Sequence, residues 1–254
     1  MKRIKYIFLI TFFVLCFNTV EAQQSGGGTL PLPKIGIDVG TAESPEDISV
    51  TLQILALLTV LSLAPSILIM TTSYLRIIIV FHFLKNALGT QQMPPSQLLS
   101  GIALFITFFI MAPTWDRVNE EAIQPLMDGK ISYEQAYEKG IGPIRDFMYK
   151  HVRDEDLVLF INVAGLEQPE SREDLPTYIV LPAFALSELR AGFIIGFFLF
   201  IPFLMMDMII ASVLLSMGMM MIPPMLIALP FKVLLFILVD GWNLIVGSLI
   251  RGFT

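Results

Sequence analysis

The chain has 254 residues, of which 55% are hydrophobic and only 15% are charged, whereas soluble domains average about 45–50% and about 25%. This composition is typical of a membrane protein and excludes an ordinary soluble domain. The formal net charge of −6 also excludes the basic footprint by which proteins bind nucleic acid, so no nucleic-acid partner is expected.

The first 22 residues read as a secretory signal peptide. A basic start is followed by an apolar run over residues 7–17, which is too short to span a bilayer. A small-residue site predicts cleavage between Ala22 and Gln23; an uncleaved N-terminal anchor is the alternative. Cleavage would remove Cys16, the one cysteine of the chain, and leave no thiol for a disulfide or a metal.

Residues 23–47 are polar and rich in Gly and Pro, which predicts a flexible linker. Residues 48–112 form a first apolar helical hairpin: a long helix over 50–70 with Pro65 as a kink, a turn over 86–97, and a second apolar run. That second run, Leu98–Ala112, has 15 residues and is shorter than the roughly 20 that a spanning helix needs.

Residues 113–177 differ in charge from everything around them. They contain seven Lys and Arg residues against fourteen Asp and Glu residues, with hydrophobic residues interspersed. Such a mixture predicts a small acidic helical subdomain that faces water and buries one side of each helix. With the mature N-terminus outside, the positive-inside bias places Arg76, His82 and Lys85 on the cytoplasmic side and this subdomain in the periplasm.

Residues 178–254 form a second apolar helical block. It is expected to be broken at Asp207, at Pro223-Pro224 and at Pro230, with a polar notch at Asp240. The fold class predicted from the whole chain is all-α: membrane-associated helical hairpins with broken helices, plus the acidic subdomain.

The most informative stretch is Met219-Met220-Met221, which lies between Gly218 and Pro223-Pro224. Three consecutive residues cannot share one helical face, and the flanking residues favour a loop. Non-helical backbone at membrane depth persists only where it is buried in protein or lines a cavity. A pore or gasket of soft thioethers is one interpretation, and filling of an irregular core by methionine is the other.

Three charged residues lie within the second apolar block. Asp207 and Asp240 are either a proton or ion relay or structural partners of Arg190 or Lys232. Lys232 is either a possible buried charge or a cation that extends toward the membrane interface. Just before them, Glu188 either seals a subunit interface or begins a solvated helix.

Enzyme signatures are missing from the sequence. It has no phosphate-binding glycine loop with Lys-Ser/Thr, no His-Glu-x-x-His and no Gly-x-Ser-x-Gly, the motifs that mark common nucleotide, zinc and hydrolase sites. The two histidines fall in different segments, so a shared metal is not expected. The sequence predicts neither an enzyme nor a cofactor.

Two blocks of the sequence resemble the FliP family, the flagellar biosynthetic proteins of the type III export gate. The first runs over residues 57–95 and includes Phe81-His82-Phe83-Leu84-Lys85-Asn86-Ala87-Leu88-Gly89 and Met93-Pro94-Pro95. The second runs over residues 187–244 and includes Ser216-Met217-Gly218-Met219-Met220-Met221-Ile222-Pro223-Pro224 and Leu229-Pro230-Phe231-Lys232.

The resemblance implies a multi-pass protein of the bacterial inner membrane at the flagellar basal body. About five copies would join FliQ and FliR, and then further export-apparatus proteins, in a helical staircase around a channel. The Met219–Met221 loop would be the gasket of that channel, closing around unfolded flagellar substrates. Glu188, Phe147 and Phe160 would be subunit contacts, and a separate ATPase and the proton-motive force would supply energy.

Two other functions fit the apolar pattern itself. A secondary transporter of small solutes would place broken helices around a midplane site and would need Asp207 or Asp240. A scaffold that only nucleates assembly would need Glu188 but would tolerate changes in the methionine loop.

Overall fold

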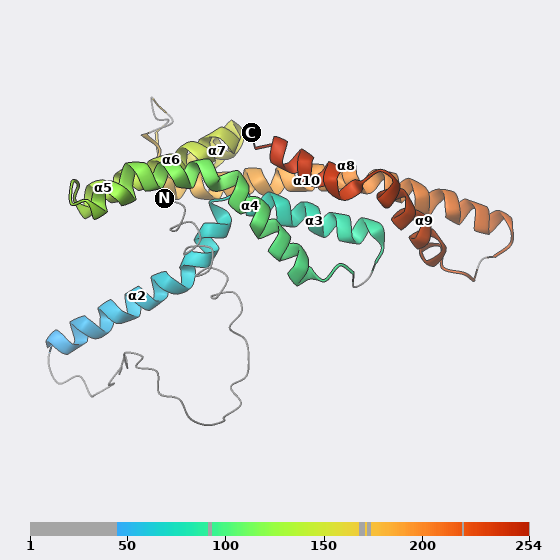
Figure 1. Ribbon diagram of the computed structural model, residues 1–254, viewed down its shortest axis with the longest axis horizontal. Coiled ribbons are helices and arrows are strands. Elements are labelled where there is room, and N and C mark those ends of the chain that lie inside the picture. The colour runs from blue at the N-terminus through green and yellow to red at the C-terminus, as the bar shows by residue number, and fades with distance from the viewer. Residues whose placement is uncertain (1–44, 91–92, 168–170, 172–173, 220, 254) are drawn as a thin grey trace, which may run out of the picture. The chain divides into compact units, whose positions relative to one another are not determined.

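The computed structural model describes residues 45–90, 93–167, 171, 174–219 and 221–253, and side chains from Leu52 onward. The predicted signal peptide, its cleavage site at Ala22 and Gln23, and most of the linker therefore lie outside the described residues. The chain divides into two units, residues 1–51 and 52–254. In the part that is described, all regular structure is helical (Figure 1), which confirms the predicted all-α fold.

The first hairpin begins with α2 (Pro45–Met70), which includes Pro65, and continues into α3 (Tyr74–Leu88). The three residues between them are buried and polar: Thr71, Thr72 and Ser73. From Leu52 onward, the apolar window of α2 is 0% buried. The helix satisfies its backbone through its own hydrogen bonds, and its apolar side chains are free to contact lipid or other subunits.

The apolar run that was predicted to close the hairpin forms a longer helix than the sequence indicated. Helix α4 (Ser96–Val118) has 23 residues, and the chain continues through the π-helical turn η1 (Asn119–Ile123) into α5 (Gln124–Met127). Pro113 lies inside α4 without ending it. The prediction of a run too short to span is therefore wrong, because proline is tolerated in an apolar helix and the helix extends into the acidic segment.

The acidic segment contains α6 (Tyr133–His151) and α7 (Asp154–Ala164). Helix α6 begins with a complete capping box, in which Ser132 accepts from the Gln135 backbone N–H and the Gln135 side chain accepts from the Ser132 backbone N–H. Three carboxylates occupy the first turn of α7, where the positive end of the helix dipole favours them. Hydrophobic residues from α4, α6, α7, the start of α8 and the C-terminal segment share one buried core.

Helix α8 (Thr177–Ser216) has 40 residues and runs unbroken through Pro182, Pro202 and the predicted break at Asp207. It packs along α3 (Figure 1). At Gly196 an added Cβ would lie 2.4 Å from Phe83 Cδ2 and 2.8 Å from Phe83 Cβ, so glycine is required for the two backbones to approach this closely.

The chain returns through α9 (Pro224–Leu238) and α10 (Gly241–Arg251), which are bent by 60° relative to each other. Pro230 lies inside α9 and does not break it. Asp240 occupies the bend with a left-handed φ of 49°, which Asp tolerates better than most residues. Of the predicted breaks, Pro223-Pro224 and the notch at Asp240 are real.

Three helical segments of the described chain are long and apolar enough to cross a membrane: Leu52–Met70, Ser96–Met127 and Thr177–Ser216. The bent pair α9–α10 adds a fourth if it counts as one span. These helices expose many large hydrophobic side chains in the single chain. Such a surface is typical of a protein that is covered by lipid or by other subunits.

Candidate functional site

The methionine loop joins two apolar helices that both end sharply. At the end of α8, the Gly218 N–H donates to Leu215 O and the Met219 N–H donates to Leu214 O, each at 3.0 Å, and Gly218 has a φ of 76°. This is the Schellman pattern that terminates a helix. Pro224 then opens α9 at its first position, where proline lacks no useful hydrogen bond.

The two described methionines of this loop are both exposed. Met221 is 97% exposed and Met219 is 43% exposed in the single chain, while Met220 lies outside the described residues. Neither Met219 nor Met221 is buried in a core of the described chain. Their thioethers are left available for contacts that other molecules supply.

An ion pair joins α8 to α9 below the loop. Lys232 Nζ lies 2.6 Å from Asp207 Oδ2 and also donates to Ala87 O at 3.1 Å. Lys232 is 3% exposed, so its ammonium is buried within the described chain. Asp207 lies nine residues before the end of α8, about 13 Å along the helix axis. The pair therefore connects α3, α8 and α9 at one level.

Asp240 is not part of this pair. It is exposed in the single chain and accepts a hydrogen bond from Asn243 Nδ2 at 3.1 Å. Arg190, the other proposed partner of the carboxylates, is also exposed. The geometry thus brings together Asp207 and Lys232, and leaves Asp240 at the bend between α9 and α10.

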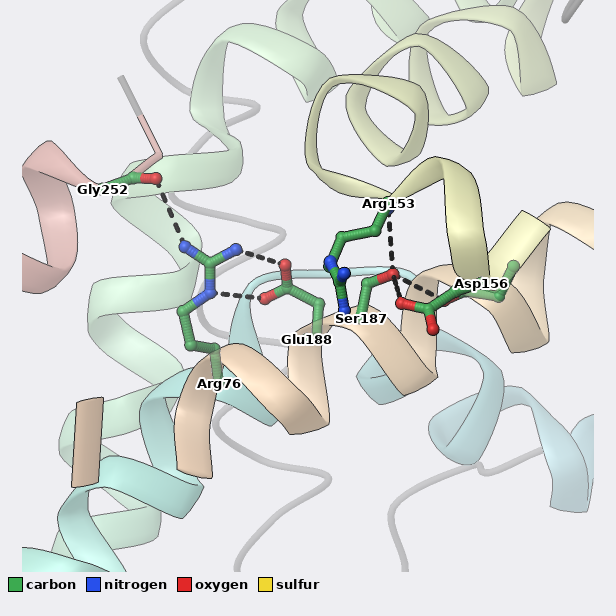
Figure 2. A network of polar contacts seen from close by, with 7 residues as sticks. Arg76, Arg153, Asp156, Ser187, Glu188 and Gly252 are labelled. Carbon is green, nitrogen blue, oxygen red and sulfur yellow. Dashed lines mark hydrogen bonds and ion pairs between the residues drawn. The ribbon is translucent and has the colours of Figure 1, made fainter. Parts of the chain in front are cut away.

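A second polar cluster lies where α3, α8 and the C-terminal segment meet the acidic subdomain (Figure 2). Arg76 Nε donates to Glu188 Oε2 at 2.9 Å, Arg76 Nη2 donates to Glu188 Oε1, and Arg76 Nη1 donates to Gly252 O at 3.2 Å. Glu188 is 0% exposed. Both of its oxygens are occupied by a bidentate guanidinium, which is the strongest geometry for such a pair.

Ser187, the residue before Glu188, holds the subdomain. Its hydroxyl donates to Asp156 Oδ2 at 2.6 Å and accepts from the Arg153 backbone N–H at 3.0 Å, as Figure 2 shows. Ser187 is buried. Two adjacent residues of α8 therefore secure two different neighbours, the start of α7 and the side chain of Arg76.

His151 lies in an aromatic pocket beside this cluster. Its ring is 4.9 Å from the ring of Phe147 and 5.0 Å from that of Phe253, between centroids. Burial, reinforced by the charges of Arg76 and Lys150, lowers the pKa of His151 from 6.5 to about 4. Its Nε2 atom is buried without a hydrogen-bond partner, so the pocket suits the neutral imidazole.

The three predicted subunit contacts are all engaged within the chain. Phe147 is a buried member of the subdomain core, and Phe160 is partly buried against the same core. Glu188 is buried in the ion pair with Arg76. The structure thus brings Phe147 and Phe160 into one cluster, and leaves part of the Phe160 side chain at the surface of the single chain.

Arg76 lies beside the acidic subdomain, which contradicts the predicted separation of the two. It was expected on the cytoplasmic side, away from the acidic subdomain, yet it contacts Glu188 and lies over the ring of Phe253, 3.9 Å from its centroid. Phe253 in turn stacks on Phe147 of α6. Arg76 and the subdomain are therefore neighbours. No local signal could have found this pair, because 112 residues separate its members.

These features define a class: an all-α protein with several apolar helices of membrane-spanning character and a helix break at a methionine loop. Comparison with known protein families then identifies the family. The FliP family model matches residues 57–249, and the chain belongs to the FliP family, whose members are flagellar biosynthesis proteins of the export apparatus.

Individual relatives agree with the family. The chain is 56% identical over 217 residues to the flagellar biosynthetic protein FliP of Bacillus subtilis, covering 85% of this chain and 98% of that protein. It is 48% identical to the Caulobacter vibrioides protein of the same name over 86% of this chain and 82% of that one. It is 45% identical to the Aquifex aeolicus protein of the same name, over 92% of this chain and 98% of that protein.

Proposed function

We propose that this chain is a pore-forming subunit of the flagellar protein export gate and that Met219, Met220 and Met221 seal its channel. The observation that carries the proposal is the loop itself. It interrupts two apolar helices, and Met221 is almost fully exposed in the single chain. Since irregular backbone at membrane depth must be buried in protein or line a cavity, a channel built from several copies accounts for it.

The apolar surface supports an assembly with other membrane subunits. The exposed hydrophobic side chains on α2, α4 and α8 form far more apolar surface than a soluble monomer leaves open. About five copies joined with FliQ and FliR in a head-to-tail arrangement would cover much of it. In this proposal the complex lies in the bacterial inner membrane, with residues 113–177 facing the periplasm and unfolded flagellar proteins as substrates.

Thioethers suit a seal around variable cargo. Methionine is flexible and polarizable, and it repacks against different shapes at low cost. A ring of such side chains could close against itself at rest and then yield to an extended polypeptide. The transition would need no catalytic residue, which agrees with a proposal in which energy comes from elsewhere in the apparatus.

The first experiment measures ion leakage through the assembled gate. Replacing Met219, Met220 and Met221 with Ala is expected to raise membrane conductance, because the smaller side chains cannot close the opening. The matched control replaces Met205 and Met208, which are also exposed methionines but lie within α8. Equal conductance in the loop variant, the control and the native gate would contradict the seal.

The composition of the complex is tested separately. Native mass spectrometry of the full chain, co-expressed with FliQ and FliR in mild detergent, should give a discrete particle with about five copies. A monomer or dimer that binds neither FliQ nor FliR would contradict the proposed role in the export gate and favour a small-solute transporter.

A further inference from the structure

We propose that Arg76 is a positioning residue for gate assembly, and that Glu188 supports assembly through its pair with Arg76 inside one chain rather than by touching a neighbouring copy. This inference rests on the proposed function and assigns how one of its interface residues acts. It starts from the burial of Glu188: a side chain that is 0% exposed has no surface to offer to another subunit.

Arg76 contacts two segments that lie far from it in the sequence. Its guanidinium binds both oxygens of Glu188 on α8 and the carbonyl oxygen of Gly252 after α10, and its Cζ atom lies 3.9 Å from the centroid of the Phe253 ring. Arg76 itself belongs to α3. One side chain thus ties the first hairpin, the long helix and the C-terminal segment together (Figure 2).

We call the contacts of Arg76, Glu188 and Gly252 the joint. The same turn of α8 extends the joint to the acidic subdomain. Ser187 accepts from the Arg153 backbone N–H and donates to Asp156, which fixes the start of α7. The joint therefore sets the angle at which the subdomain meets the apolar helices. Copies in a staircase must repeat one subunit geometry, so a change at this joint alters every interface without any residue of the joint lying in it.

The electrostatics make an outward role for Glu188 costly. If its carboxylate turned toward a neighbour, Arg76 would remain buried without its counter-charge, and an unpaired buried charge is strongly destabilising. The Gly252 carbonyl and the Phe253 ring cannot neutralise the guanidinium. The pair therefore acts as a unit, and the two residues should be energetically coupled.

The experiment is a double-mutant cycle with two readouts. Glu188→Leu and Arg76→Met are made singly and together in the full chain. The first readout is amide hydrogen exchange at residues 153–157 and 250–253 of the isolated protein in detergent. The second is the fraction of protein in the complex with FliQ and FliR, by native mass spectrometry. Glu121→Gln is the matched control, since Glu121 makes an exposed ion pair with Arg117 in the same subdomain, outside both exchange segments.

Each single variant is expected to speed exchange at both segments and to lower the assembled fraction by about tenfold or more, because it leaves one buried polar partner unmatched. The double variant should recover most of both properties, since removing both members of a buried pair is often nearly neutral. Glu121→Gln should change neither. Recovery of exchange without recovery of assembly would show that Glu188 contacts a neighbour directly, and would overturn the proposal.

Two other outcomes are informative. Additive effects of the single variants on exchange would show that Arg76 and Glu188 act independently, and would also overturn it. Failure of the native protein to join FliQ and FliR would contradict the proposed function alone, because exchange in the isolated chain would still decide whether the joint exists.

Discussion

The acidic subdomain (residues 113–177) and the methionine loop differ in how their side chains are buried. Around the subdomain, Phe184 and Glu188 are fully buried and the polar side chains of Figure 2 find partners within one chain. Around the loop, Met221 and most of the apolar surface of α8 and α9 find none there. The acidic subdomain and the start of α8, the closed region, can be complete in a single subunit. The methionine loop with the apolar parts of α8 and α9, the open region, requires surroundings that only a membrane or an assembly provides.

The largest expected effect separates two phenylalanines of α8. Phe184 is 0% exposed and Phe198 is 65% exposed. Phe184→Ala should lower the free energy of unfolding by about 3–5 kcal/mol, as for a large core side chain, whereas Phe198→Ala should change it little in detergent. Thermal unfolding of the isolated protein measures both. Similar losses for the two variants would break the comparison between a closed and an open region.

Variants of the Asp207–Lys232 ion pair test whether these two charges of the open region stabilise the fold. Asp207→Asn should destabilise the chain by about 3 kcal/mol, because it leaves Lys232 buried without a counter-charge. Asp207→Leu combined with Lys232→Met should recover most of that loss. Denaturant titration gives the stabilities, and a motility assay gives export. A stable double variant that exports nothing would instead favour a proton or ion relay at Asp207.

The glycine contact between α8 and α3 sharpens the comparison within the apolar region. Gly196→Ala should cost about 1–3 kcal/mol, since its Cβ would overlap Phe83. Gly101→Ala is the control in α4, where an added Cβ meets nothing within 4 Å. That variant should be neutral or more stable by up to about 1 kcal/mol, as for alanine in a helix. A larger loss at Gly101 would contradict the packing described for this region.

The smallest effect is a pH dependence in the closed region. His151 has a pKa lowered to about 4 in the folded chain, chiefly by burial, against about 6.5 when unfolded. The unfolded state therefore binds more protons between these values, and stability should fall as the pH falls from about 6.5 to about 4. Because the ring is only partly shielded, the slope should be below about 1.4 kcal/mol per pH unit.

His151→Phe should flatten this slope, because no proton can then bind at that position. His82→Gln is the matched control, since His82 is exposed on α3, outside the aromatic pocket. Chemical denaturation at several pH values between about 4 and 7 measures all three proteins. A slope that persists in His151→Phe would assign the pH dependence to other groups.

By itself, the sequence determined the all-α class, the apolar blocks, the helix break at the methionine loop and the family, because these depend on composition, on Gly and Pro positions and on contiguous motifs. Only the tertiary structure decided which charges meet. Arg76 was expected across the membrane from the acidic subdomain, but it pairs with Glu188, and Lys232 pairs with Asp207. It also showed that Asp207 and Pro230 do not break helices. The physical reason is that a buried charge needs a partner in space, and neither its distance along the chain nor its local pattern specifies that partner.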